Sequence, residues 1–242
     1  MAAAGIYCIS IPPPRVPGVR LTTGEITVAL TDYLLAIECA FFALMLIRTD
    51  GAWLEIRWFF VTFFGFTALA SLTGGAYHLL LSNSSSMSAA ILWKTTVIAI
   101  GAATLAAWSI GACLLFAQPI RGRIVKAAFA AFMIYSIYVV AVDDHFWVAI
   151  ANYIPAAVFL GLSFAYSYRR HPDAPILAGL LGLSVTGVAA AIQRLSLSLH
   201  PLYFNHNATY HLLEAVGLFL IFRAALYFVR NPYQAASVGC NN

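Results

Sequence analysis

The chain has 242 residues, of which 62% are hydrophobic and only 9% are charged. A soluble globule of this length needs more polar surface, so the composition indicates an integral membrane protein. The formal net charge of +4 is spread thinly, with no basic run longer than Arg169-Arg170, which argues against nucleic acid as a partner. Four scattered cysteines argue against both a disulfide framework and a thiolate metal site.

Residues 1–25 are rich in proline and lack a charged leader followed by a long apolar core, so they are predicted to form an extramembrane segment. Seven apolar stretches follow that suit spans of about 20 residues. They cover residues 26–47, 58–81, 89–116, 125–142, 146–166, 174–197 and 208–229. Because their connections are short, residues 26–230 are predicted to form an all-α bundle of seven transmembrane helices. Residues 231–242 are then a short cytoplasmic tail.

Lysine and arginine are concentrated in the loops after the first, third and fifth predicted helices, and the other three loops contain neither. Because positive residues favour the cytoplasmic side, the amino terminus is predicted outside and the carboxyl terminus inside, in the cell membrane. Polar side chains then gather at the outer helix ends. They are Asp32, His78, Lys94, Asp143, Asp144, His145, Gln193, Arg194, His200, His206, Asn207 and His211.

The three consecutive residues Asp143, Asp144 and His145 separate the fourth predicted helix from the fifth. They could hold a divalent cation at the outer surface. An exposed acidic turn between two helices is the simpler interpretation.

Two glutamates lie within the predicted spans. Glu38 is about 12 residues into the first span, and Glu214 is two turns into the last. A charge at the helix centre costs roughly 2.5–3.5 kcal/mol on insertion scales, so each glutamate is expected to be protonated, paired or metal-bound. The alternative is a neutral glutamate that is hydrogen-bonded across a helix interface.

The start of the last helix carries a polar face. Asn207, His211 and Glu214 are spaced by four and three residues, which places them on one side of a helix. Asn207 is a good N-cap and is expected to begin the helix. His206 would then lie on the preceding loop.

The second helix offers a matching set of residues. His78 and Ser71 are seven residues apart and share a face, while Gly74 and Gly75 allow a neighbouring helix or a ligand to approach closely. Imidazole is the commonest metal ligand in proteins, and catalytic zinc takes three protein ligands and keeps one open position. The predicted zinc ligands are His78, His206, His211 and Glu214, with Asp32 and Asn207 as alternatives for the third position. The competing interpretation is that His78 and His211 only form hydrogen bonds at the interface.

This layout of seven helices, an outward amino terminus, His78 near the end of helix two and histidines opening helix seven resembles the CREST superfamily. That superfamily includes alkaline ceramidases and the progestin and adipoQ receptors. The resemblance implies that His78 and His211 bind zinc and that the protein hydrolyses a lipid amide. The sequence departs from the pattern at Gly74, where a serine is expected, at Asn207, where a histidine is expected, and at Lys94, near an expected aspartate. The signature "FNHN…YH" more closely resembles an uncharacterised group of seven-helix membrane proteins.

A zinc-dependent hydrolase of a lipid amide or ester is therefore the first functional prediction. Asp32, Glu38 or Ser71 would orient water or contact the oxyanion, and the apolar bundle would accept an acyl chain. One alternative is a non-catalytic subunit of a larger membrane complex or a receptor-like bundle. Another is a haem-binding electron carrier with His78 and His211 as axial ligands. The expected partners are the lipid bilayer, a lipid substrate and other membrane subunits.

Overall fold

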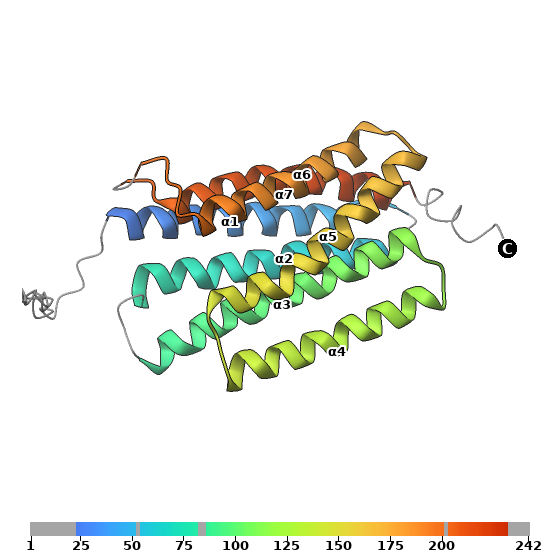
Figure 1. Cartoon of the computed structure of the whole chain (residues 1–242). Helices are drawn as coiled ribbons and strands as arrows, with labels where there is room; N and C mark the ends of the chain where they lie inside the picture. The colour runs from blue at the N-terminus through green and yellow to red at the C-terminus, as the bar shows by residue number, and fades with distance from the viewer. Residues whose placement is uncertain (1–22, 52–53, 82–85, 201–202, 232–242) are drawn as a thin grey trace, which may run out of the picture.

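The computed structural model describes residues 23–51, 54–81, 86–200 and 203–231. This part of the chain is helical apart from turns and an isolated β-bridge between His200 and Phe204. The elements, shown in Figure 1, are α1 (Thr23–Arg48), α2 (Leu54–Ala76), the π-helical turn η1 (Tyr77–Leu81), α3 (Met87–Leu115), α4 (Ile120–Ala141), α5 (Phe146–Arg170), α6 (Ala174–Arg194) and α7 (His206–Arg230).

Seven helices in the described residues are long and apolar enough to cross a membrane, with η1 continuing α2 in the second of them. They match the seven predicted spans, including the separation between α4 and α5, which is made by residues 142–145. The proposed extramembrane segment, residues 1–25, lies outside the described residues except for its last three, which open α1. The tail, residues 231–242, lies outside them except for Asn231. Which end of the bundle faces the cytoplasm stays a prediction.

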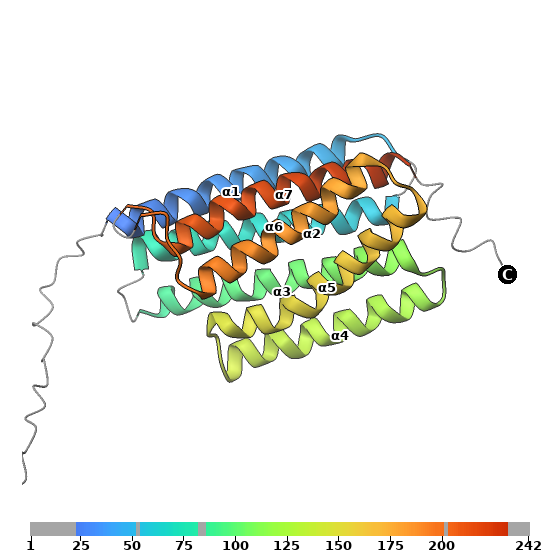
Figure 2. The same ribbon diagram turned by 45° about the horizontal axis from the view of Figure 1, so that its top comes forward.

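Helix α3 lies at the centre of one half of the bundle and packs against α2, α4 and α5. Its buried face is built mainly from small residues such as Ala99, Ala103 and Ala107, which let neighbouring backbones approach closely. Helix α4 packs on α3 and lies at the margin of the molecule in both views (Figures 1 and 2). Its side chains Ile134 and Ile137 are more than half exposed, as expected of a helix that contacts lipid.

The helices α1, α2 and α7 form the part of the bundle that carries most of the predicted site. Phe42 of α1 stacks on Phe222 of α7 with ring centroids 4.2 Å apart, and Phe64 of α2 meets both rings edge-on. This aromatic cluster is apolar and largely buried. It fixes how the three helices lie against one another below the polar residues described next.

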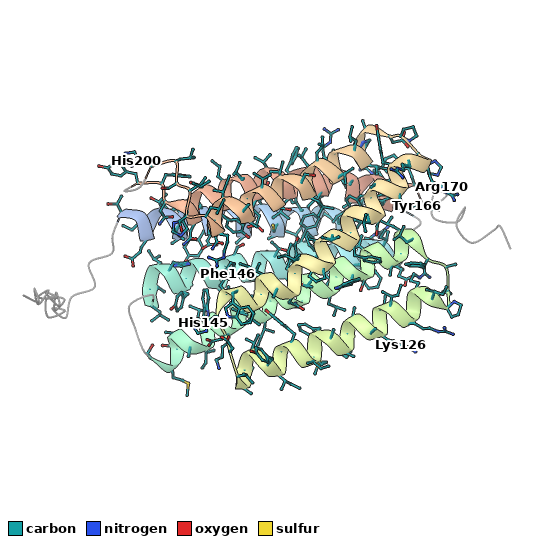
Figure 3. The ribbon with its side chains drawn as sticks, in the orientation of Figure 1. Lys126, His145, Phe146, Tyr166, Arg170 and His200 are labelled. Carbon is teal, nitrogen blue, oxygen red and sulfur yellow. The ribbon has the colours of Figure 1, made fainter. Side chains whose placement is uncertain are left out.

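Polar residues divide between the two ends of the bundle, as the sequence predicts. Figure 3 shows His145 and His200 at one end and Lys126 and Arg170 at the other. We call these the histidine end and the arginine end. At the arginine end Arg121 pairs with Glu55 at 2.9 Å, which joins the start of α4 to the start of α2. The histidine end contains the start of α1, η1, the start of α3, the loop between α4 and α5, and the start of α7 (Figure 1).

Candidate functional site

The histidine end contains a buried contact between an acid and a histidine from opposite ends of the sequence. Nε2 of His211 in α7 lies 3.3 Å from Oδ1 of Asp32 in α1, and the two side chains are only 11% and 6% exposed. The other ring nitrogen, Nδ1, lies 3.1 Å from the hydroxyl oxygen of Thr31. Both nitrogens of the imidazole therefore face α1, and its orientation is fixed. We call Thr31, Asp32 and His211 the buried centre.

The hydrogen bonds of Thr31 indicate which nitrogen of His211 carries a proton. The Thr31 hydroxyl lies 2.9 Å and 3.1 Å from the backbone carbonyls of Val28 and Thr27, so its single proton has acceptors on its own helix. Its oxygen can then accept a hydrogen bond from Nδ1–H of His211. We assign this tautomer because it satisfies all three groups. It leaves Nε2 with a lone pair directed at Asp32, so Nε2 and Oδ1 share either one proton or one bound cation.

The second carboxylate oxygen of Asp32 has an unusual environment. Among the described residues, Oδ2 has no hydrogen-bond partner although it is buried. A buried acceptor without a partner costs about 1–3 kcal/mol, so its presence marks the place as one where a ligand is expected. Two glycines of α2 face it. A Cβ atom at Gly74 would lie 3.7 Å from Oδ2, and one at Gly75 would lie only 2.9 Å from the Cβ atom of Asp32.

These distances confirm the expectation that Gly74 and Gly75 permit close approach, and they show that the approaching element is α1. Ser71 is buried on α2 about one turn further from the histidine end. His78 lies on η1, is partly exposed, and is near enough to His211 for the two rings to interact electrostatically. A π-helical turn is rare and often lies at a functional site.

The start of α7 differs from the prediction. Asn205 is the N-cap, because its Oδ1 accepts hydrogen bonds from the backbone N–H groups of Asn207 and Ala208. The prediction that Asn207 caps the helix and leaves His206 on a loop is therefore wrong. Asn207 instead accepts a hydrogen bond from Gln193 of α6 at 3.4 Å, and His206 is the first residue of the helix.

Glu38 and Glu214 lie nearer the middle of the bundle, and Glu214 is still within electrostatic range of Asp32. Glu38 is six residues further along α1 than Asp32, or roughly 9 Å by the helical rise. It lies within electrostatic range of Glu214, which accepts a hydrogen bond from Tyr210 one turn earlier in α7. Oε2 of Glu38 is buried and has no partner within the described part of the chain. Neither Tyr210 nor Thr31 is predicted from the sequence, because a tyrosine or a threonine in an apolar helix carries no sign of a polar role.

The predicted zinc ligands are therefore brought together only in part. Within the described ranges, the one group of three or more metal-binding side chains with all ligand atoms within 4.8 Å is Asp143, Asp144 and His145. Of the residues predicted for the site, Asp32 and His211 make direct contact. His78 lies close by, and Glu214 lies about one turn along α7, within electrostatic range of Asp32. His206 lies more than one turn from His211 in the other direction.

The loop between α4 and α5 holds a second contact between an aspartate and a histidine, which we call the rim pair. Nδ1 of His145 and Oδ1 of Asp143 are hydrogen-bonded, and the backbone N–H of His145 donates to the same oxygen at 2.9 Å. These bonds lower the pKa of the Asp143 carboxyl and raise the pKa of the His145 imidazole. The His145 side chain is 80% exposed, so water competes for every one of these interactions.

The fold defines the class of protein: an all-helical bundle whose seven helices are suited to cross a membrane. Residues 27–229 match the model of a family described as "Family of unknown function (DUF6962)", and the chain belongs to this family. No curated protein and no solved structure matches the chain.

Proposed function

We propose that this protein is a multi-pass membrane hydrolase that binds zinc at the buried centre and cleaves an amide or ester bond of a lipid. The proposal rests on the geometry around Asp32 and His211. Two ligands of a tetrahedral zinc ion with bonds of about 2.0–2.1 Å are separated by roughly 3.3 Å. The separation between Nε2 of His211 and Oδ1 of Asp32 is 3.3 Å.

The surroundings of these two atoms support the same interpretation. A histidine that binds a metal usually donates its other ring N–H to a neighbouring oxygen, and Thr31 provides that oxygen for Nδ1. The unpartnered Oδ2 of Asp32 supplies a further acceptor at the same place. Asp32 and His211 would hold the ion, with His78 on η1 as the third ligand.

The residues of the chain would divide the work of hydrolysis among them. Zinc supplies Lewis-acid activation of water and of a carbonyl group when it is bound. Asp32 would accept a proton from water through Oδ2, Thr31 would keep the His211 ring in place, and Gly74 and Gly75 would leave room beside the carboxylate. Leu30 and Leu34, which flank Asp32 along α1, are more than half exposed. The centre thus lies about one helix width from the lipid-facing surface, which suits a substrate that stays in the bilayer.

The haem alternative has less support. Axial ligation needs room for a porphyrin beside a ring nitrogen of each histidine, but Asp32 lies 3.3 Å from Nε2 of His211 and Thr31 lies 3.1 Å from Nδ1. A non-catalytic subunit or receptor-like bundle would need no metal at this centre, and the following experiment separates it from the hydrolase.

The test is metal analysis of the purified full-length protein, combined with hydrolysis assays on a panel of lipid amides and esters. We expect about one zinc ion per chain and zinc-dependent release of a fatty acid. The variants Asp32→Asn and His211→Ala should lose both, whereas Asp143→Asn should keep both. A well-folded protein that binds no zinc when zinc is supplied, or zinc that persists in both buried-centre variants, would overturn the proposal.

A further inference from the structure

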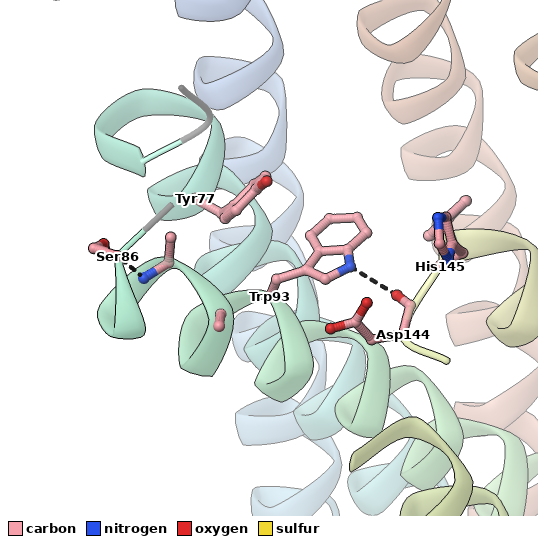
Figure 4. Close-up of a pocket in the computed structure, with 8 residues that line it drawn as sticks. Tyr77, Ser86, Trp93, Asp144 and His145 are labelled. Atoms are coloured by element: carbon pink, nitrogen blue, oxygen red, sulfur yellow. Dashed lines mark hydrogen bonds between the residues drawn. The ribbon is translucent and has the colours of Figure 1, made fainter. Parts of the chain in front are cut away.

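A second feature of the histidine end is a pocket whose lining residues do not include those of the buried centre. It has a volume of about 380 Å³ and lies between the start of η1, the start of α3, and the loop before α5 with the first residue of that helix. It is lined by Tyr77, Ser86, Ala89, Ala90, Trp93, Asp144, His145 and Phe146, several of which Figure 4 labels. This volume is within the range of small-molecule sites.

Three aromatic rings line this pocket. The ring of Trp93 lies 5.0 Å from that of Tyr77 and 6.3 Å from that of Phe146, with tilts of 43° and 47°. A tryptophan near a membrane interface often serves only as an anchor whose indole N–H faces water or headgroups. Here Nε1 of Trp93 donates to the backbone carbonyl of Asp144 at 2.8 Å (Figure 4). The indole is therefore held in one orientation as part of a wall.

The charge beside these rings is negative on balance. Asp144 contributes a half-buried carboxylate, and its nearest cation is Nζ of Lys94 at 3.9 Å. Lys94 also donates to the backbone carbonyl of Val140 at 2.8 Å, which holds its ammonium at the long end of the ion-pair distance and leaves Asp144 only partly neutralised. The negative charge of Asp143 is directed to His145. The Asp144 carboxylate is thus the principal charge available to a ligand in the pocket.

We propose that this pocket binds an alkylammonium cation of the choline or ethanolamine type. Aromatic faces attract such cations through their quadrupoles, with tryptophan the strongest, and aromatic cages are the usual sites for quaternary ammonium groups. Asp144 adds a carboxylate that a cation can reach from the pocket. An anion would meet the aspartates, and a neutral ligand would gain nothing from the acidic side.

This site is independent of the proposed hydrolase activity. Its ligand could be a free amine or the headgroup of a lipid, because the pocket lies at the end of helices that span the apolar layer. Both sources present the same ammonium chemistry.

The first experiment compares choline with 3,3-dimethyl-1-butanol, its neutral carbon analogue of the same shape, by calorimetric titration of the purified full-length protein. We expect choline to bind at least about tenfold more tightly, since only choline gains the cation–π and carboxylate interactions. Equal affinity for the two compounds, or no binding of either, would overturn the proposal. Competition of calcium or zinc with choline that disappears in Asp143→Asn would also overturn it, because the loop would then be a divalent-cation site.

Variants separate the charge from the ring. Asp144→Asn keeps the backbone carbonyl that accepts from Trp93 and should weaken choline binding by about tenfold, while Asp143→Asn should change it less than twofold. Trp93→Leu should weaken it by about tenfold, and Trp93→Phe by about two- to fivefold. Lys94→Gln should tighten binding severalfold, because it removes the cation that competes for Asp144. Unchanged affinity in Asp144→Asn, with thermal stability also unchanged, would contradict the role of the carboxylate.

A final comparison identifies the source of the ammonium group. The titration is repeated in nanodiscs of phosphatidylcholine and of phosphatidylglycerol. Weaker apparent binding of choline in phosphatidylcholine indicates that lipid headgroups occupy the pocket, whereas equal binding indicates a free amine. Either result supports the proposed chemistry, provided that the neutral analogue still binds poorly.

Discussion

The two contacts between an aspartate and a histidine at this end of the bundle use the same functional groups in opposite surroundings. In the buried centre, Asp32 and His211 are 179 residues apart in sequence, lie on different helices and are almost fully enclosed. In the rim pair, Asp143 and His145 are two residues apart and His145 is mostly exposed. Water can replace either partner at the rim but cannot do so between α1 and α7. Only in the buried centre does the loss of one group leave the other unsatisfied.

The supporting residues differ in the same way. Thr31 fixes the His211 ring, and Gly74 and Gly75 bring α2 against the Asp32 side chain. Asp143 is less enclosed, with its side chain 21% exposed, and it accepts hydrogen bonds from the backbone and side chain of His145 in the same short loop and from Trp147 of α5. A functional site therefore depends on more than the two reactive groups. The residues around them must also hold these groups in place and keep water away from them.

The largest difference between the two pairs is expected from removing the carboxylate charge. Asp32→Asn should abolish stoichiometric zinc binding and lower hydrolysis to the uncatalysed background, since it removes an anionic ligand with little change in shape. Asp143→Asn should leave both within twofold of the wild type. Metal content by mass spectrometry and fatty-acid release measure the effect. Equal losses in the two variants would show that burial does not distinguish the pairs.

The next largest effect, on zinc affinity, is expected from changing Thr31, which orients the His211 ring. Thr31→Val keeps the shape of the side chain but removes the acceptor for Nδ1–H of His211, and such a loss typically weakens metal binding by about 10–100-fold. The matched control is Thr27→Val, because the Thr27 hydroxyl donates to the carbonyl of Thr23 on its own helix. Competition with a calibrated zinc chelator measures the affinity. If both variants bind zinc equally well, the hydroxyl of Thr31 does not orient the ring.

Close packing against Asp32 gives a smaller effect, on stability. At Gly75 a methyl group would lie 2.9 Å from the Cβ atom of Asp32 and 3.2 Å from the carbonyl oxygen of Ala29, so Gly75→Ala must push α1 away from α2. Overpacking of this kind costs about 1–3 kcal/mol. Gly65→Ala in the same helix meets nothing within 4 Å and should be neutral or stabilising by up to about 1 kcal/mol. Unfolding in detergent compares the two, and similar midpoints would mean that α1 and α2 adjust without cost.

The arrangement of helices could be predicted from the sequence because it depends on local quantities. Each span is recognisable as about 20 apolar residues, and the loops are recognisable by their charged residues. The sequence therefore predicts even the short break at Asp143 correctly. The division into a histidine end and an arginine end followed from the same pattern. Helix ends were less certain, because Asn205 and Asn207 are equally good caps and only the folded loop selects the first.

The buried centre could be predicted only as separate residues. Asp32 and His211 were both candidates, but the contact between them depends on the relative height of α1 and α7, which the aromatic packing of Phe42 on Phe222 helps to set. Local sequence carries no information on that height. Glu38 and Glu214 show the same limit, because the sequence places both near the site but does not reveal that Glu214 interacts electrostatically with both Asp32 and Glu38.

The smallest expected effect concerns the rim pair and is a pH dependence of choline binding. The hydrogen bond and the charge of Asp143, with a smaller effect of Asp144, raise the pKa of His145 above its ordinary value of about 6.5. Because His145 lines the proposed ammonium pocket, its positive charge at low pH opposes a cationic ligand. Choline affinity should therefore increase as pH rises through the His145 pKa, by about two- to fivefold because water screens the exposed ring.

His145 is the residue to test, since the other charged groups near it are Asp143, Asp144 and, beyond Asp144, Lys94. Titrations with choline between about pH 5.5 and 9 should show the increase centred above pH 6.5. His145→Gln should bind equally across that range, whereas His200→Gln, a change at another exposed histidine of the same end, should keep the wild-type dependence. A pH dependence that survives in His145→Gln would assign the titrating group elsewhere. The rim pair would then be a local hydrogen bond that does not influence ligand binding in the pocket, unlike the role proposed for the buried centre.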